Sequence, residues 1–285
     1  MEAIFRPGTV DDAQTCGTIC YEAFKVIAGQ HNFPPDFPSP EVAVALLSMV
    51  LSRKDVFSVV AELNGHVVGS NFLWEGDTIA GVGPITVLPA AQNGSLGRQL
   101  MERILDRAHA QRFISVRLVQ AAYHNRSLSM YAKLGFDARE PLSVLQGPAL
   151  KLDLPGYAVR SATLEDLDAC NRLCLSVHGH DRSREVTDAI AQGTARVVER
   201  GGRVTGYATN IGYFAHAVGQ TNEELKALIG GAPAFVGPGF LLPTRNGELF
   251  RWCLAHGLRV VHPMTLMSRG LYQKPAGAFL SSVLY

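Results

Sequence analysis

The chain contains an internal repeat, and this feature limits its architecture more than any other. The segment Arg6–Cys20 aligns with Arg160–Cys174, with one Arg, one Thr, one Asp and two Cys in common. Two later segments also match, SVVAELNGHVVGS and ARVVERGGRVTGY, and both predict β-hairpins that turn at Asn64-Gly65 and at Gly201-Gly202. Because the matches occur in the same order in both halves, we expect a duplicated fold.

A third match extends the repeat, and a Pro- and Gly-rich stretch separates the copies. Val82-Gly83-Pro84 followed by Leu88-Pro89 recurs as Val236-Gly237-Pro238 followed by Leu242-Pro243. The stretch GPALKLDLPG, at 147–156, lies between the end of the first copy and the start of the second. A chain of 285 residues is long enough for two hydrophobic cores. We therefore expect domains at 1–147 and 157–285, joined by a linker at about 148–156.

The composition is that of a well-packed globular chain without a broad charged surface. Hydrophobic residues make up 47% and the formal net charge is +1, so nucleic acid is not an expected partner. No apolar run is long enough to span a bilayer, and the N-terminus has no signal-peptide core. These features predict a cytoplasmic protein without a membrane partner, and they leave a homodimer open.

Neither the cysteines nor the histidines predict a metal site. The five cysteines include two pairs spaced by four residues in helical segments, where packing in a reduced interior is expected. His178, His180 and Asp181 are residue types that bind metals, but they lie in a predicted loop and lack a full ligand set. We expect a polar loop contact there and no metal.

The first half predicts a mixed α/β order of elements. We expect a strand at Ile4–Arg6, a helix capped by Thr9 or Asp11, a Pro-rich loop at Asn32–Pro40, a helix at Glu41–Leu51, the hairpin, a strand at Ile85–Leu88, a helix from Leu96, a strand at Val116–Ala121 and a helix from Ser127. The Pro-rich loop carries Phe33 and Phe37. Two roles remain open for it, shaping a ligand site and forming an ordered surface loop.

The entry to the helix from Leu96 has the composition of a phosphate site. The loop QNGSLG, at 92–97, follows a β-branched strand and a proline and places small residues at the helix N-terminus. Free backbone N–H groups and the positive end of the helix dipole attract an anion there, and small residues let a diphosphate reach the backbone. An ordinary strand-to-helix turn also uses glycine, so the loop alone leaves both interpretations open.

Two motifs carry a resemblance to a known family. The loop 92–97 resembles the Q/R-x-x-G-x-G/A acyl-CoA signature of the GNAT superfamily of N-acetyltransferases, although Ser95 stands where the family has its first glycine. The stretch NRSLSMYAKLGF, at 125–136, is similar to the second GNAT signature, an Asn at a strand end followed by Tyr-x-Lys-Leu-Gly-Phe. Leu128, Tyr131 and Leu134 share one helix face, so Tyr131 should point inward. The resemblance covers about 4–147.

The resemblance implies an α/β architecture, the mixed α+β GNAT fold, in two GNAT-like domains that each have a central mixed sheet flanked by helices. It also implies direct transfer of an acetyl group, in a ternary complex, from acetyl-CoA to an amine of a small molecule or peptide, without a metal. The cofactor-binding residues that it implies are Val87, Leu88, Gln92, Asn93, Gly94, Ser95, Leu96, Gly97, Arg98 and Asn125. Tyr131 is then the catalytic residue that protonates or hydrogen-bonds the departing thiolate.

The general base is less well defined by the sequence. The family often uses a carboxylate or a water chain near the central strands, which nominates Glu75, Asp77 and His124. None of them occupies a position that matches the family residue by residue. For Glu75, a solvated carboxylate in a turn is the preferred interpretation.

The second half is expected to be a degenerate GNAT-like domain. One alignment replaces the loop 92–97 by NGELFR, at 246–251, whose bulky and acidic side chains would exclude a diphosphate. A rival alignment sets 246–257 against 125–135, places Cys253 where the tyrosine would be, and implies that a helix and a strand were lost. Under both alignments the second half is an inactive partner that forms one wall of the acceptor cleft.

Two functions of different classes are compatible with these motifs. The first is an N-acyltransferase, and the second is a non-catalytic acyl-CoA-binding sensor or scaffold in which the degenerate half blocks transfer. Tyr131 favours catalysis. A nicotinamide or flavin oxidoreductase is not supported, because the loop lacks G-x-G-x-x-G and the acidic ribose partner.

Overall fold

The residues that the two copies share form the same contacts in both. In the computed structural model, which describes residues 3–76 and 78–284, Arg6 pairs with Asp12 at 2.8 Å and with a glutamate of the first hairpin at 2.7 Å. Arg160 likewise pairs with Asp166 at 2.7 Å and with a glutamate of the second hairpin at 2.6 Å. Each aspartate also closes a capping box with a threonine. The repeated residues therefore fix the same turn from first strand to first helix.

The first half contains the elements that the sequence predicts, in the predicted order, together with two strands that were not predicted, at Ile79–Val82 and Asp137–Gln146. They are β1 (Ile4–Pro7), α1 (Ala13–Gln30), α2 (Pro40–Ser52), β2 (Val56–Leu63), β3 (His66–Glu75), β4 (Ile79–Val82), β5 (Thr86–Val87), α3 (Leu96–Ala110), β6 (Ser115–Ala121), α4 (Asn125–Lys133) and β7 (Asp137–Gln146). Asn64 and Gly65 have φ values of 53° and 77°. This left-handed conformation is what a two-residue hairpin turn between β2 and β3 requires.

The second half has a comparable order of elements. They are β8 (Ala158–Ser161), α5 (Leu167–His178), α6 (Ser183–Ala191), β9 (Arg196–Arg200), β10 (Arg203–Ala208), β11 (Ala217–Gly219), α7 (Asn222–Gly230), β12 (Phe240–Pro243), α8 (Gly247–Ala255), β13 (Arg259–Gly270) and β14 (Ala278–Leu280). Three short 3-10 turns, Val10–Asp12, Pro89–Ala91 and Leu164–Asp166, complete the secondary structure of the described residues.

The element order decides between the two alignments of the repeat. The unit β12–α8–β13 matches β6–α4–β7, and α4 and α8 are both followed by a left-handed glycine, Gly135 at φ 86° and Gly257 at φ 84°. Helix α7 has the place in the second half that α3 has in the first, so the expectation that a helix was lost is wrong. The third sequence match is also not a structural one, because β5 pairs with β3 whereas β12 pairs with β7.

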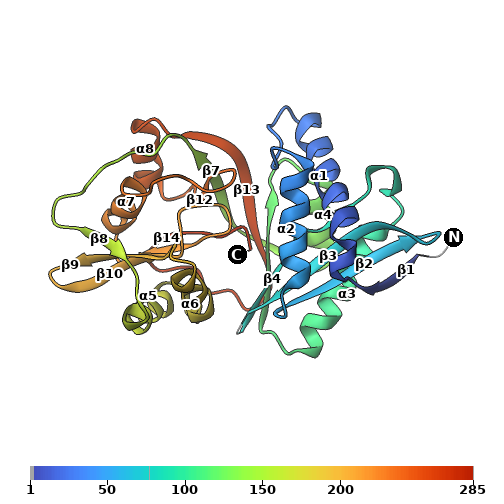
Figure 1. Ribbon diagram of the computed structural model, residues 1–285, viewed down its shortest axis with the longest axis horizontal. Coiled ribbons are helices and arrows are strands. Elements are labelled where there is room, and N and C mark those ends of the chain that lie inside the picture. Colours follow the sequence, from blue (N-terminus) through green and yellow to red (C-terminus); the bar gives the residue numbers. More distant parts are fainter. Residues whose placement is uncertain (1–2, 77, 285) are drawn as a thin grey trace.

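Strand β13 joins the two halves. It lies between β6 and β7 and is antiparallel to both, pairing 264–270 with 115–121 on one side and 259–268 with 137–146 on the other. Strand β12 pairs with the outer edge of β7. One sheet, in the order β1-β2-β3-β4-β6-β13-β7-β12 with β5 beside β3, therefore runs through both lobes (Figure 1).

The second sheet, β14-β11-β10-β9-β8, is smaller. Its described pairings are all antiparallel, which differs from the expected mixed sheet because β12 and β13 pair in the first sheet instead. The expected mixed α/β architecture, with helices flanking the sheets, is confirmed. The division into 1–147 and 157–285 stays a prediction, and β12 and β13 belong to the second segment by sequence but to the first sheet by pairing.

Helices cover both faces of the first sheet. On one face, Cys16 of α1 and Leu47 of α2 pack with Phe72 of β3. On the other face, Leu100 of α3 packs with Leu73, the next residue of the same strand. Because successive side chains of a strand point to opposite faces, β3 separates two cores. Below, the face under α1 and α2 is called the α1 face and the opposite one the α3 face.

Removing the second half should unfold the first. A fragment of residues 1–156 lacks β13, so the facing edges of β6 and β7 would lose their hydrogen-bond partners and expose apolar surface. We expect this fragment to be aggregated or unfolded in circular dichroism and size-exclusion measurements, and we expect co-expression with residues 157–285 to restore a folded complex. A monomeric fragment that unfolds cooperatively on its own would contradict this role of β13.

Candidate active site

A cavity opens where two neighbouring strands of the first sheet diverge. Strands β4 and β6 are parallel neighbours only over 79–81 and 115–117. The chain then continues as β5, which pairs with β3, while β6 continues against β13. A cavity of about 580 Å³, called the splay cavity below, is lined by residues 82–87 on one side of the gap and 118–121 on the other.

The splay cavity reaches both faces of the sheet. On the α3 face its lining includes Leu96 and Gly97 of α3 and Met130 and Tyr131 of α4. On the α1 face it reaches α1 and the loop between α1 and α2, and residues of the second lobe complete the wall. The lining residues on this side include Phe24, Ile27, Gln30, Asp36, Phe37, Tyr213, Phe214, Val283 and Leu284. A bound molecule can therefore extend through the gap between β5 and β6 and reach both faces of the sheet.

Most of the residues that the sequence proposes for cofactor binding line this cavity. Those that do are Val87, Gln92, Asn93, Ser95, Leu96, Gly97 and Arg98, together with the proposed catalytic Tyr131. Leu88, Gly94 and Asn125 are not among the lining residues. The N–H of Leu88 donates to the carbonyl of Val68 in β3 at 2.8 Å, so this amide points away from the gap. The binding role of each residue stays a prediction.

The N-terminus of α3 is open to an anion. Its N-cap residue is Ser95, which makes no side-chain cap, and the first turn carries no acidic residue. Ser95 has φ 65°, a left-handed conformation that glycine adopts more easily. This agrees with a glycine at the corresponding position of the GNAT signature. Unsatisfied N–H groups and the helix dipole make such an end a phosphate site.

Arg126 adds positive charge beside this loop. Its guanidinium donates to Gln92 Oε1 at 2.6 Å and to Asn93 Oδ1 at 3.0 Å. Gln92 in turn donates from Nε2 to the carbonyl of Val87 at 3.0 Å. The loop, the end of β5 and the start of α4 are thus held together around the mouth of the cavity.

The N-terminus of the corresponding helix in the second lobe is occupied by a carboxylate. Helix α7 carries Glu223 and Glu224 in its first turn, and Glu224 is fully buried. The Glu224 carboxylate accepts a hydrogen bond from the N–H of Thr221 at 2.9 Å. A carboxylate already occupies the anion position at this helix end, so a diphosphate would meet like charge there.

Tyr131 is buried at the α3 face of the cavity. It is 5% exposed and belongs to the core cluster that α3 forms with the sheet. Burial raises the pKa of its hydroxyl, and a hydrogen bond with the Ser127 side chain opposes this shift. The phenol is therefore protonated at neutral pH and is available as a hydrogen-bond donor.

The three proposed bases have different surroundings. Glu75 forms a bidentate ion pair with Arg107, with distances of 2.6 and 3.0 Å, and does not line the splay cavity. It is therefore an ion-paired carboxylate outside the cavity, not the freely solvated carboxylate that the sequence suggested. His124 does line the cavity, caps α4 by accepting from the N–H of Ser127 at 3.0 Å, and has a pKa lowered by burial. Asp77 lies outside the described residues.

Three polar residues of the cavity were not predicted from the sequence. Gln120 of β6 is 6% exposed and neither atom of its side-chain amide has a partner. Thr86 of β5 is 4% exposed with an unpaired hydroxyl, and Asp36 of the loop between α1 and α2 has a buried, unpaired Oδ2. Nothing in the local sequence marks these positions, because only the assembled sheet buries them.

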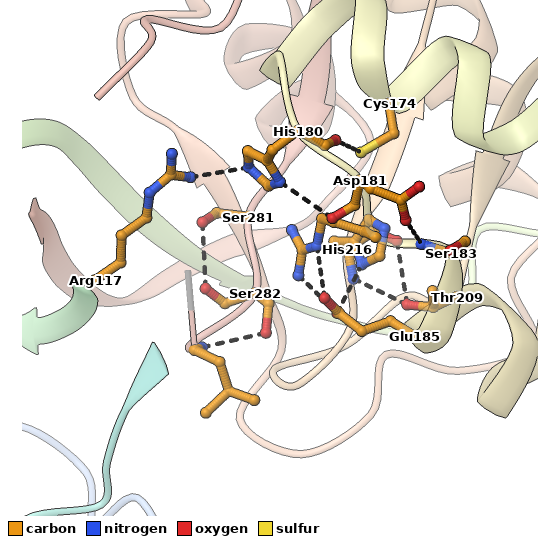
Figure 2. A network of polar contacts seen from close by, with 12 residues as sticks. Arg117, Cys174, His180, Asp181, Ser183, Glu185, Thr209, His216, Ser281 and Ser282 are labelled. Atoms are coloured by element: carbon orange, nitrogen blue, oxygen red, sulfur yellow. Dashed lines mark hydrogen bonds and ion pairs between the residues drawn. The ribbon is translucent and has the colours of Figure 1, made fainter. Parts of the chain in front are cut away.

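A second polar network joins β6 to the second lobe and is distinct from the cavity (Figure 2). Arg117 Nη1 lies 3.1 Å from His180 Nε2. Burial and the nearby Arg182 lower the pKa of His180 to about 3, so the neutral ring accepts from the guanidinium. Glu185 lies 2.7 Å from Arg182 and 3.2 Å from His216 Nδ1. The described residues contain no group of His, Cys, Asp and Glu that could hold a metal.

Comparisons with known proteins agree with the first motif assignments. Residues 26–136 match the Acetyltransferase (GNAT) family. An IAA acetyltransferase from Azospirillum brasilense is 35% identical over 94 residues, which cover 32% of this chain and 61% of that protein. The chain therefore spans about three fifths of this relative. No described helix is long and apolar enough to cross a membrane.

Solved structures resemble nearly the whole chain. A putative acetyltransferase from Pyrococcus horikoshii has a TM-score of 0.72 at 17% identity and covers 94% of this chain and 89% of its own. A GCN5-related N-acetyltransferase from Sphaerobacter thermophilus has a TM-score of 0.64 at 16% identity, covering 95% and 96%. A tandem GNAT protein from the clavulanic acid biosynthesis pathway has a TM-score of 0.56 at 14% identity, covering 94% and 98%. At these identities the likeness shows the fold.

Replacing Gly97 by Glu should abolish the anion site at α3. A Cβ at Gly97 would lie 3.7 Å from the Met130 sulfur, an ordinary contact, so the fold should tolerate the change. The longer acidic side chain, however, would enter the cavity beside the helix N-terminus. We expect the affinity for coenzyme A, measured by calorimetry, to fall by about tenfold or more.

A control variant separates this local effect from a general change in charge. Ala110→Glu adds the same charge at the exposed C-terminal end of the same helix and should leave the affinity unchanged. Undiminished binding by the Gly97 variant, at an unchanged melting temperature, would place the coenzyme elsewhere.

Proposed function

We propose that this protein, whose residues 26–136 match the acetyltransferase (GNAT) family, is an N-acyltransferase that moves an acetyl group from acetyl-CoA to an amine of a small molecule or peptide. Transfer is direct, with both substrates bound at once. The observation that carries the proposal is the splay cavity, which joins a phosphate-accepting helix end, a gap between two strands and the buried hydroxyl of Tyr131.

The α3 face supplies the groups that bind the coenzyme. The N-terminus of α3, with Arg98 and Arg126 at the rim of the cavity, attracts the diphosphate. Because Leu88 directs its N–H toward β3, the alternation of a strand directs the backbone groups of Val87 toward the gap. Gln120, with both side-chain amide atoms unpaired, offers a donor and an acceptor to the amides of the pantetheine arm.

The reaction requires a donor for the departing sulfur. The amine nitrogen attacks the carbonyl carbon of the thioester, the carbon–sulfur bond breaks, and the thiolate takes a proton from Tyr131 Oη while the amine loses one to solvent. A buried phenol that stays protonated is suited to this step. The backbone of β5 at the gap is placed to donate to the oxygen on which charge develops.

Ser127 provides a route by which Tyr131 regains its proton. The Ser127 side chain hydrogen-bonds Tyr131, and both residues line the splay cavity, so water in the cavity can return a proton to the tyrosine through Ser127 Oγ. His124 holds Ser127 in place, because its Nδ1 accepts from the backbone N–H of Ser127 at 3.0 Å and its Nε2 lies 3.4 Å from Ser127 Oγ.

The alternative function is a non-catalytic acyl-CoA-binding sensor or scaffold. It requires the second lobe to block the acceptor's approach, whereas Tyr213 and Leu284 of that lobe line the cavity without closing it. A sensor would bind and release acetyl-CoA unchanged in the presence of any amine, and an acyltransferase would release free coenzyme A.

Each chain should bind one molecule of acetyl-CoA. The N-terminus of α3 is open, but the carboxylate of Glu224 occupies the N-terminus of α7. Only the first lobe can therefore hold the diphosphate. Isothermal titration should give a stoichiometry of one per chain. Two equivalent sites per chain would show that the second lobe is also a functional GNAT domain.

Replacing Tyr131 by Phe should lower turnover and leave coenzyme binding intact. The ring and its packing remain while the hydroxyl is lost, so kcat should fall by about 100-fold or more and the affinity for acetyl-CoA should change little. Tyr207→Phe is the matched control, because Tyr207 is a buried tyrosine of the second lobe whose hydroxyl lies 3.0 Å from His216 Nε2. It should lower the melting temperature and keep kcat. Near-normal turnover in a folded Tyr131 variant would exclude the residue from the mechanism.

A further inference from the structure

The splay cavity carries opposite charges at its two ends. Its α3 end has Arg98, Arg126 and the positive end of a helix dipole. Asp36, in the loop between α1 and α2, is the sole acidic side chain among the described residues that line it. The α3 end suits an anionic substrate, and the α1 end therefore suits a cationic one.

Asp36 lacks a partner for its charge. Its Oδ2 is buried and has no hydrogen-bond partner. Three titratable groups face it directly, the thiol of Cys20 on α1, the hydroxyl of Tyr123 after β6 and the hydroxyl of Tyr213 from the second lobe, and the rings of His31 and His262 contact Tyr123. Neither the thiol nor the two phenols supply a positive charge. Asp36 is half-buried, and a carboxylate oxygen that is buried without a counter-charge is costly, so a bound ammonium would remove that cost.

The unpaired hydroxyl of Thr86 is a second, independent indication that this end of the cavity binds a polar group. Val87 packs in the core of the α3 face, so Thr86, its neighbour in β5, points to the α1 face. Its buried hydroxyl has no partner, although such groups in native structures are almost always paired. A ligand between β5 and the loop that holds Asp36 could satisfy both side chains.

The walls around Asp36 are aromatic and apolar. Phe24 of α1 packs against Phe37 of the loop with ring centroids 5.9 Å apart. Tyr213 and Phe214 extend this surface from the second lobe. The loop is held in place because Phe33 stacks on Tyr123 at 4.3 Å. This part of the cavity can hold an apolar or aromatic body attached to the amine.

We infer that the acceptor is a primary amine with an aromatic or apolar body, which binds as its ammonium ion to Asp36 on the α1 face of the splay cavity and releases one proton to solvent before its nitrogen attacks the thioester. This rests on the proposed function, because it names the substrate class for the same cavity. Asp36 is a specificity-determining residue that selects cationic amines over neutral and anionic acceptors. Thr86 contributes a second hydrogen bond, and Phe24, Phe37 and Tyr213 contact the apolar body.

The central experiment compares the wild type with Asp36→Asn, using 2-phenylethylamine as the probe. We expect calorimetric titration of the amine into coenzyme A-saturated protein to show binding that the variant weakens by about 30-fold or more, since one partner of a buried charged hydrogen bond is removed. In steady-state assays the KM for the amine should rise by a similar factor, while kcat and the KM for acetyl-CoA change little. Asp11→Asn, which alters an exposed carboxylate of the same lobe, should change none of these values.

The variant is expected to fold. Burial raises the pKa of Asp36 from its ordinary 3.8 to about 6, so the stabilisation that comes from protonating it is lost as the pH rises through 6. At pH 7.5 the ionised carboxylate therefore destabilises the folded state, and Asn should keep or raise the melting temperature. Asp36→Glu, which retains the charge, should recover part of the affinity.

The pH dependence of amine binding provides a readout that a merely structural role would not produce. As the pH falls below about 6, Asp36 becomes protonated and the wild type should lose affinity for 2-phenylethylamine, whereas Asp36→Asn should show no such loss. The nearby histidines His31 and His262, whose rings contact Tyr123, are present in both proteins. The difference between the two profiles therefore isolates Asp36.

The outcomes separate this inference from the proposed function. Unchanged amine affinity in Asp36→Asn, absence of amine binding by the wild type, or a fall in kcat at unchanged KM would overturn the assignment of Asp36 as the ammonium site. Transfer of acetyl groups to other acceptors would then still support the enzyme. Failure of the wild type to bind acetyl-CoA at all would instead overturn the proposed function.

Discussion

The insertion of β13 between β6 and β7 holds the two halves of the molecule together and positions the candidate active site. A strand near the C-terminal end of the sequence completes the sheet of the N-terminal half. With β13 paired along one edge of β6, the other edge is free to separate from β5 and open the splay cavity. The same pairing brings the second lobe against the first, so that Tyr213 and Leu284 line the cavity. Backbone pairing between the halves thus creates both the gap and its outer wall.

The two halves share the same start of the fold, but they differ at the helix N-terminus that determines whether an anion can bind. Both retain the pairing of Arg6 with Asp12, or of Arg160 with Asp166, at the start of the unit. Helix α3 leaves its first amides open, whereas α7 has Glu224 folded back onto its own N-terminus. A repeat can therefore preserve its fold while one copy loses the electrostatic basis for binding a diphosphate.

The sequence predicted the features that depend on local rules. Turn chemistry predicted the Asn64-Gly65 hairpin, small residues indicated the open entry to α3, and helical spacing placed Tyr131 toward the core. It did not predict β13, because the partner of a strand is set by the whole sheet rather than by neighbouring residues. Asp36 and Gln120 were missed for a related reason, since each is an ordinary polar residue until the assembled cavity buries it without a partner.

The proposed function requires that the protein transfers an acyl group to nitrogen and does not merely bind acetyl-CoA. The most direct measurement uses acetyl-CoA labelled with ¹³C in the acetyl group, incubated with the protein and a mixture of primary amines, with products identified by mass spectrometry. We expect the label to appear on an amine nitrogen in the same amount as free coenzyme A is released. Acetyl-CoA that is bound stoichiometrically but recovered intact, with no labelled amine, would contradict it.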